Sequence, residues 1–148
     1  MRQAKVYEII PGLFVRGHIR RIRDRCRRQF WLEDNTDVVV GMVQPFMMDV
    51  DKYMVYYYCP IIDGALRQDT IKILHKLADK IVGKIHRGNR VIIYCKRGRN
   101  RSCLMAALVT RLVLGISGKE ALKHTQKKRP NSLANTHFAN FLISLGEP

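Results

Sequence analysis

Residues 91–102 read Val-Ile-Ile-Tyr-Cys-Lys-Arg-Gly-Arg-Asn-Arg-Ser, a short apolar strand that ends in a cysteine and a basic loop. An apolar helix predicted over 104–114 follows directly. A strand–loop–helix unit directs successive backbone N–H groups, and the positive end of the helix, into one concavity. Such a concavity suits a phosphate dianion, and the same field stabilises a thiolate. The stretch therefore predicts a phosphate-binding loop with the Cys95 sulfur at its base.

Each residue type of this loop suits one task in the cleavage of a phosphate monoester. Cys95, as a thiolate, would attack phosphorus, and Arg101 offers a planar fork that matches two phosphate oxygens. Gly98 permits a backbone conformation that a side chain would obstruct, and Ser102 would donate a hydrogen bond to the departing sulfur. The residues expected to bind the phosphate group are Lys96, Arg97, Gly98, Arg99, Asn100 and Arg101.

A proton donor for the leaving oxygen is expected outside this loop. The segment 59–64, Cys-Pro-Ile-Ile-Asp-Gly, follows a strand predicted at 54–58. One carboxylic acid can protonate the leaving group and then activate a water molecule. We expect this strand to be parallel and adjacent to the strand before Cys95, which would bring their carboxyl ends together. Asp63 is therefore the predicted general acid and base, although Asp-Gly is also a common turn pair.

Strand and helix patterns alternate along most of the chain. Strands are predicted within 6–15, around a Pro-Gly turn, and over 37–43, 54–58 and 91–94. Helices are predicted over 69–86 and 104–114, after a cap at Ser117 and after a cap at Asn135. This order predicts an α/β fold in one domain over 1–148, with a mostly parallel sheet of about four or five strands and helices on both faces.

The chain of 148 residues carries a formal net charge of +15. That excess favours polyanionic partners such as RNA, anionic lipid or a phosphorylated surface, although charge runs are also common as solvated faces. Six of the arginines fall within 20–28, where the pattern does not decide between helix and loop. No apolar run has the length of a membrane span, and no secretory segment is evident at the N-terminus.

The cysteines and histidines show no metal-ligand spacing, so we expect neither a metal nor a cofactor. The four cysteines also lack a disulfide pattern, which favours a reducing compartment. We therefore expect a cytoplasmic protein, with the nucleus as the alternative. The sequence leaves the oligomeric state open.

The loop fits the CxxGxxR(S/T) signature of the cysteine-dependent protein phosphatases, and the chain resembles their dual-specificity branch over nearly its whole length. Residues 7–14 resemble the opening strand and turn of that family, and 60–63 resemble its general-acid loop. Arg129-Pro130, followed by 135–138, resembles its late segment, in which an asparagine, here Asn135, supports the phosphate loop. The resemblance implies hydrolysis of phosphorylated proteins through a phosphocysteine, with Cys95, Arg101, Asp63 and Ser102 as catalytic residues.

Two departures from the family pattern keep other functions open. Tyr94 stands where the family usually has histidine, which makes a phosphate-binding module without catalysis conceivable. The Gly98-x-Asn100-Arg101 pattern is similar to that of phosphatase-like RNA 5′-triphosphatases, which are also basic. The alternatives to a protein phosphatase are therefore an RNA 5′-triphosphatase and a phosphate-binding pseudophosphatase.

Overall fold

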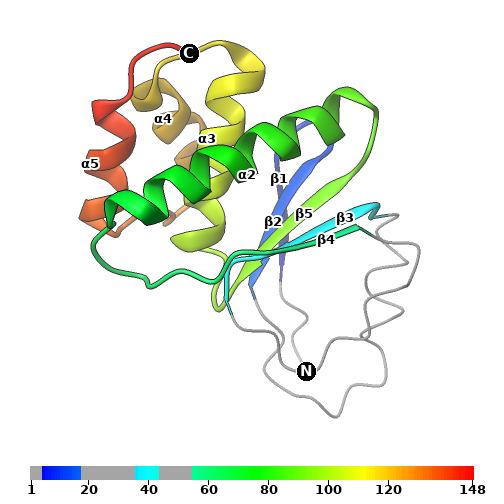
Figure 1. The fold of residues 1–148 in the computed structure, drawn as a ribbon, viewed down its shortest axis with the longest axis horizontal. Helices are drawn as coiled ribbons and strands as arrows, with labels where there is room; N and C mark the ends of the chain where they lie inside the picture. The colour runs from blue at the N-terminus through cyan, green and yellow to red at the C-terminus, as the bar shows by residue number, and fades with distance from the viewer. Residues whose placement is uncertain (1–4, 18–35, 44–54) are drawn as a thin grey trace.

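A computed structural model describes residues 5–17, 36–43 and 55–148, which form one sheet and four helices (Figure 1). The strands are β1 (Val6–Ile10), β2 (Leu13–Gly17), β3 (Val38–Gly41), β4 (Val55–Tyr58) and β5 (Val91–Cys95). The helices are α2 (Gln68–His86), α3 (Arg101–Leu114), α4 (Gly118–Lys128) and α5 (Thr136–Ser144). The predicted arginine cluster at 20–28 lies outside the described residues.

The five strands lie in the order β1-β2-β5-β3-β4. β1 is antiparallel to β2, and every other neighbouring pair is parallel. All residues of the central strand β5 are buried, as expected for a parallel strand covered on both faces. The α/β class and the mostly parallel sheet predicted from the sequence are confirmed.

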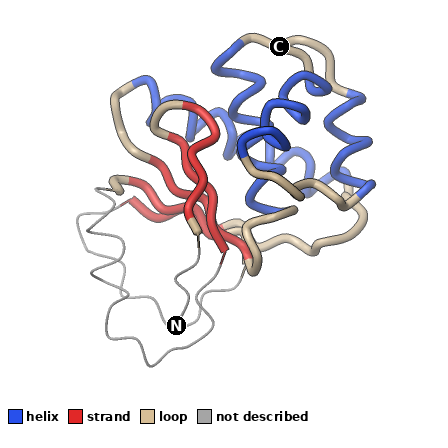
Figure 2. The backbone as a smooth tube through the Cα atoms, turned by 180° about the vertical axis from the view of Figure 1, so that it is seen from behind, coloured by secondary structure: helices blue, strands red, loops and turns tan. Residues whose placement is uncertain are grey.

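The two faces of the sheet belong to different apolar clusters. Val91, Ile93 and Cys95 point into the main core, together with the buried faces of the helices. Ile92 and Tyr94 alternate with them and pack on the opposite face. The described helices gather on the first face only (Figure 2). The helical layer expected on the second face therefore stays a prediction.

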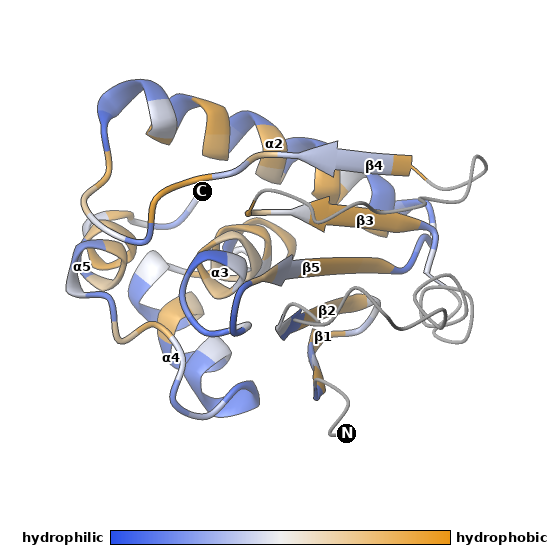
Figure 3. Cartoon of the chain, turned by 90° about the horizontal axis from the view of Figure 1, so that it is seen from below, coloured by the Kyte–Doolittle hydropathy of each residue, from blue (hydrophilic) through white to orange (hydrophobic). Residues whose placement is uncertain are grey.

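Helix α3 lies at the centre of the main core. Every residue from 102 to 110 is buried, whereas α2 shows an apolar stripe to the core and charged residues outside (Figure 3). The predicted caps are also observed. Gly115 ends α3 in the left-handed conformation, and the Ser117 hydroxyl accepts a hydrogen bond from the Glu120 amide at 3.2 Å. Within the described ranges, no single helix has the length and hydropathy of a membrane span.

Candidate active site

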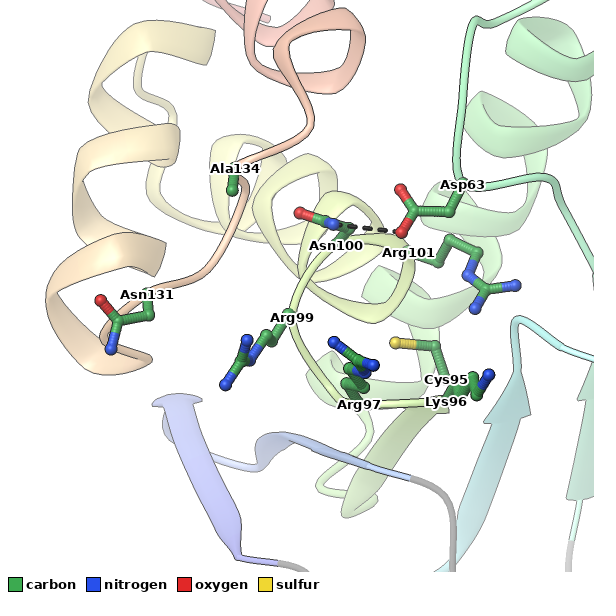
Figure 4. A pocket seen from close by; sticks show the side chains of 9 residues that line it. All are labelled: Asp63, Cys95, Lys96, Arg97, Arg99, Asn100, Arg101, Asn131 and Ala134. Atoms are coloured by element: carbon green, nitrogen blue, oxygen red, sulfur yellow. Dashed lines mark hydrogen bonds between the residues drawn. The ribbon is translucent and has the colours of Figure 1, made fainter. Parts of the chain in front are cut away.

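A pocket of about 380 Å³ opens beyond the carboxyl end of β5 (Figure 4). Open parallel sheets commonly bind ligands at this edge. The pocket is lined by Asp63, Cys95, Lys96, Arg97, Arg99, Asn100, Arg101, Asn131 and Ala134. It therefore brings together most of the residues that the sequence singled out.

The predicted nucleophile, Cys95, lines this pocket and lies within hydrogen-bond distance of a buried serine. The Cys95 sulfur is 3.2 Å from the Ser102 hydroxyl oxygen, and both residues are buried. Ser102 stands in the first turn of α3, so the sulfur also lies near the positive end of a buried helix. The pairing predicted between these two side chains is present.

Gly98 is required by the close approach of the phosphate loop to β2. Its φ angle is +65°, a conformation that other residues rarely adopt. A Cβ atom added there would lie 2.5 Å from the carbonyl carbon of Arg16 and 2.6 Å from the Gly17 nitrogen. The sequence correctly predicts a conformational role for this glycine.

The carbonyl groups of the loop accept hydrogen bonds from outside it. The Arg129 guanidinium donates from Nε to Gly98 O at 3.0 Å and from Nη2 to Arg97 O at 3.4 Å. The Leu133 amide donates to Arg99 O at 2.9 Å. With these carbonyls bonded away from the pocket, we expect the loop N–H groups to face its interior.

The Arg101 side chain joins the loop to the segment that carries Asp63. Its Nη1 atom donates to the Ile61 carbonyl at 3.4 Å. Its buried Nε atom has no hydrogen-bond partner among the described residues. A buried donor without a partner is costly, so Arg101 keeps a donor for an anion in the pocket.

Two amides hold the Asp63 carboxylate. Asn100 Nδ2 donates to one oxygen at 3.1 Å, and Asn135 Nδ2 donates to the other at 2.8 Å (Figure 4 shows the first of these bonds). The backbone N–H of Asn135 in turn donates to Asn100 Oδ1 at 3.1 Å. Asn135 thus supports the Cys95 loop through its backbone, while its side chain holds the segment that carries Asp63 and caps α5.

The route by which Asp63 reaches the pocket differs from the prediction. β3 lies between β4 and β5, so the strand before Asp63 is not adjacent to the strand before Cys95. The chain crosses β3 after leaving β4: the Cys59 amide donates to Gly41 O at 2.8 Å, and the Ile61 amide to Met42 O at 3.1 Å. The prediction failed because strand order is not encoded in local patterns.

Tyr94 lies on the face of the sheet opposite the helices. Its hydroxyl is 2.7 Å from that of Tyr56, and burial raises the pKa of both tyrosines. Gly41 makes room for this pair, since a Cβ atom there would lie 2.5 Å from the Tyr94 oxygen and 2.6 Å from the Tyr56 oxygen. Tyr94 is therefore accommodated as a neutral, hydrogen-bonded core residue.

Two of the three described cysteines are held as thiols. Burial raises the pKa of Cys59. Burial, followed by the negative charge at Cys95, raises the pKa of Cys103 to about 12, against the opposing effect of Arg129. The Cys103 sulfur donates to Gly98 O at 3.5 Å, so this side chain supports the loop from behind and is no competing nucleophile.

The Cys103 thiol should make the folded protein less stable as the pH rises above about 9. In the unfolded chain it loses its proton near its ordinary pKa of 9.0, whereas in the folded chain it keeps the proton to about pH 12. Between these values the unfolded state binds fewer protons, so the free energy of unfolding falls as pH rises, by about 1.4 kcal/mol per pH unit. Urea denaturation at pH 8, 9 and 10 measures this slope. We expect Cys103→Ala to be less stable at pH 8 but to show a shallower slope, and equal slopes would contradict the assignment.

Sequence reasoning did not assign site roles to four residues that the structure brings here. Arg129 and Cys103 hold the loop from behind, and Asn131 and Ala134 line the pocket. In the sequence, Arg129-Pro130 stands out only as part of a segment that resembles the family. Cys103, Asn131 and Ala134 lie in no pattern that predicts a site role. In the described ranges, no three His, Cys, Asp or Glu side chains gather in a group that could hold a metal ion.

No family model matches the chain. A curated protein of Invertebrate iridescent virus 6, named "Putative tyrosine phosphatase 197R", is 30% identical over 117 residues, which are 76% of this chain and 42% of that protein. The chain therefore spans less than half the length of this relative.

Solved structures align with 93% of the chain. Cydia pomonella PTP-2 phosphatase matches with a TM-score of 0.78 and 22% identity over 88% of its chain. Human DUSP28 matches with a TM-score of 0.75 and 18% identity over 89% of its chain. PTPMT1, solved in complex with PI(5)P, matches with a TM-score of 0.75 and 19% identity over 92% of its chain.

These matches agree with the overall arrangement of strands and helices described above. The resemblance seen in the sequence is thereby confirmed at the level of the fold. The chain has the fold of the cysteine-dependent, dual-specificity and tyrosine protein phosphatases.

Proposed function

We propose that the protein is a cysteine-dependent phosphatase that hydrolyses phosphate monoesters of phosphotyrosine, phosphoserine and phosphothreonine proteins. The observation that carries this proposal is the pocket geometry: the Cys95–Ser102 pair at the base, with Arg101 and Asp63 at the rim. The viral relative named as a tyrosine phosphatase supports the same activity.

In the first step, the Cys95 thiolate attacks phosphorus and the bond between phosphorus and the leaving oxygen breaks. The loop amides and the Arg101 guanidinium stabilise the charge on the equatorial oxygens. Asp63, as the acid, gives its proton to the leaving oxygen. The product is a phosphocysteine and a free hydroxyl group.

In the second step, the Asp63 carboxylate accepts a proton from a water molecule that attacks phosphorus. The phosphorus–sulfur bond breaks, and Ser102 donates a hydrogen bond to the sulfur that departs as a thiolate. Asn100 and Asn135 hold the carboxylate in place for this step, because each donates to one of its oxygens.

A substrate panel tests the proposal. The purified protein is assayed on phosphotyrosine, phosphoserine and phosphothreonine peptides, a phosphoinositide and triphosphorylated RNA at controlled salt. We expect turnover of the phosphopeptides, with a salt dependence that reports the electrostatic part of binding. Absence of phosphopeptide turnover, with release of phosphate from another class, would reject the protein substrate.

An RNA 5′-triphosphatase is the second candidate. The Gly98-x-Asn100-Arg101 pattern and the net charge of +15 favour it, and binding of RNA or another polyanion by the basic surface belongs to this proposal. Release of γ-phosphate from RNA at a higher kcat/KM than from any phosphopeptide would select it.

A phosphate-binding pseudophosphatase is the third candidate, because of Tyr94. A phosphocysteine trapped in Asp63→Ala after mixing with a phosphopeptide would exclude it. For any of these functions we propose a cytoplasmic location, supported by the free thiols of Cys59, Cys95 and Cys103.

Arg101→Lys should lower kcat/KM for phosphopeptides by about 10²- to 10³-fold. Lysine keeps the charge but cannot donate two parallel hydrogen bonds to phosphate, nor bond Ile61 O in the same geometry. Steady-state kinetics measures the loss. Arg87→Lys, at the exposed end of α2, is the matched control and should be unaffected. A loss of less than about threefold in Arg101→Lys would remove this residue from the transition-state contacts.

A further inference from the structure

The side chain of Asn100 makes a contact that phosphate binding does not require. Asn100 belongs to the Cys95 loop and to the Gly98-x-Asn100-Arg101 pattern, and its backbone N–H suffices for a role in holding phosphate. Its side chain points toward Asp63, which also lines the pocket, and Nδ2 donates to the Asp63 carboxylate at 3.1 Å (Figure 4). One loop side chain therefore ties the Cys95 loop to the predicted proton donor.

The Asn100 side chain is also missing from the place where asparagine at this position usually bonds. Asn100 is the N-cap residue of α3, and an N-cap asparagine ordinarily accepts a hydrogen bond from the first turn. Asn100 makes no such bond, and its φ and ψ angles of −107° and −65° lie in the helical region instead of the extended region typical of caps. Its Oδ1 atom accepts from the backbone N–H of Asn135. Both ends of the amide are thus committed to the pocket.

The two amides that hold Asp63 differ in their other contacts. The Asn135 side chain caps α5 and also donates to the Gly64 carbonyl at 3.2 Å, so its replacement would disturb the fold in several places. The Asn100 side chain bonds Asp63 and the Asn135 backbone. Asn100 is therefore the residue at which the holding of Asp63 can be tested apart from a helix cap.

Asp63 needs to be held because it is an exposed residue on a loop. An exposed side chain samples several rotamers, and fixing one of them costs conformational entropy. A hydrogen bond to an ionised carboxylate is one of the stronger kinds and offsets this cost. Proton transfer requires the acid to lie within hydrogen-bond reach of the leaving oxygen. Because Asn100 directly precedes Arg101, its amide fixes Asp63 relative to the residues expected to hold the phosphate.

We infer that Asn100 is a positioning residue for proton transfer by Asp63, and that its amide does this in place of capping α3. Its side chain acts through Asp63 and touches neither the phosphorus nor the leaving oxygen. This inference rests on the proposed phosphatase function. It gives the asparagine of the Gly98-x-Asn100-Arg101 pattern a task that needs no RNA substrate.

Asn100→Ala tests this role by its dependence on the leaving group. We expect kcat for phosphoserine peptides to fall by about tenfold, the size of one hydrogen bond to a charged group. For p-nitrophenyl phosphate the fall should be less than about twofold, because that leaving group departs without a proton. Asn100→Ser, whose side chain is too short to reach Asp63, should show the same pattern. Asn140→Ala, at an exposed position of α5, is the matched control and should leave both rates unchanged.

A double-mutant cycle asks whether Asn100 acts through Asp63. In the Asp63→Asn protein, Asn100→Ala should lower kcat for phosphoserine peptides by less than about a further twofold, because no proton transfer remains to be positioned. A full tenfold loss in that background, an equal loss on both substrates, or a gain in rate would overturn the inference. Unfolding of both Asn100 variants, measured by urea denaturation, would also overturn it, because the residue would then be structural.

Failure of this inference is distinguishable from failure of the proposed function. If the original protein turns over neither substrate, the proposed function fails and this inference fails with it. If the original protein turns over both and Asn100→Ala behaves like Asn140→Ala, the inference alone is overturned.

Discussion

Cys95→Ser should abolish phosphatase activity, with a loss of about 10⁴- to 10⁶-fold in kcat, as when other covalent nucleophiles are removed. A serine hydroxyl at this position has no adjacent general base among the described residues to activate it, since its neighbour across 3.2 Å is the Ser102 hydroxyl. Phosphopeptide binding should persist, because the loop and Arg101 are retained. Phosphate release and calorimetric binding measure the two quantities separately.

Cys103→Ser is the matched control for this experiment. It makes the same substitution at a thiol that is fully buried and held protonated. We expect a loss of stability with most of the activity retained. Activity in Cys95→Ser above about one thousandth of the starting value would remove the phosphocysteine from the mechanism.

Asp63→Asn should lower kcat by about 10²- to 10⁴-fold for phosphoserine peptides, which have a poor leaving group that needs a proton. The loss should be much smaller for p-nitrophenyl phosphate, because its leaving group departs readily without a proton. Asparagine preserves the size of the side chain and can still accept from Asn100 or Asn135. Steady-state kinetics on the two substrates checks this dependence.

Asp69→Asn removes the same charge at an exposed position in the first turn of α2 and should leave both rates unchanged. An equal loss on both substrates in Asp63→Asn would show that Asp63 acts by holding the loop rather than by transferring a proton. If the Asp63→Asn rates equalled those of the original protein, a group other than Asp63 would be the proton donor.

The parts of the molecule that depend on local chemistry could be predicted from the sequence. The run that ends in Cys95 is apolar throughout and became the central buried strand. The stop at Gly115 and the cap at Ser117 follow from the backbone freedom of one residue and the hydroxyl of the other. The Cys95–Ser102 contact also follows, because the six residues between them form a tight loop with few possible arrangements.

The parts that depend on strand order and on long-range contacts could not be predicted. β3 separates the two strands that carry the candidate chemistry, and only the path of 59–63 across it brings Asp63 to the pocket. The bond from Asn135 to Asp63 spans 72 positions. Arg129 is recognisable as a loop support only when the carbonyls it bonds are seen in place.

Arg129 lies between the ring of Tyr7 and the loop carbonyls, so it links the edge strand β1 to the candidate active site. β1 supplies none of the residues that line the Cys95 pocket. Its Tyr7 ring nevertheless packs against the Arg129 guanidinium, which bonds the loop carbonyls. A partner that displaced β1 would therefore remove the support of Arg129 from the loop. Phosphate binding would weaken although Cys95, Arg101 and Asp63 were unchanged. Displacement of β1 would in this way regulate the proposed activity from outside the pocket.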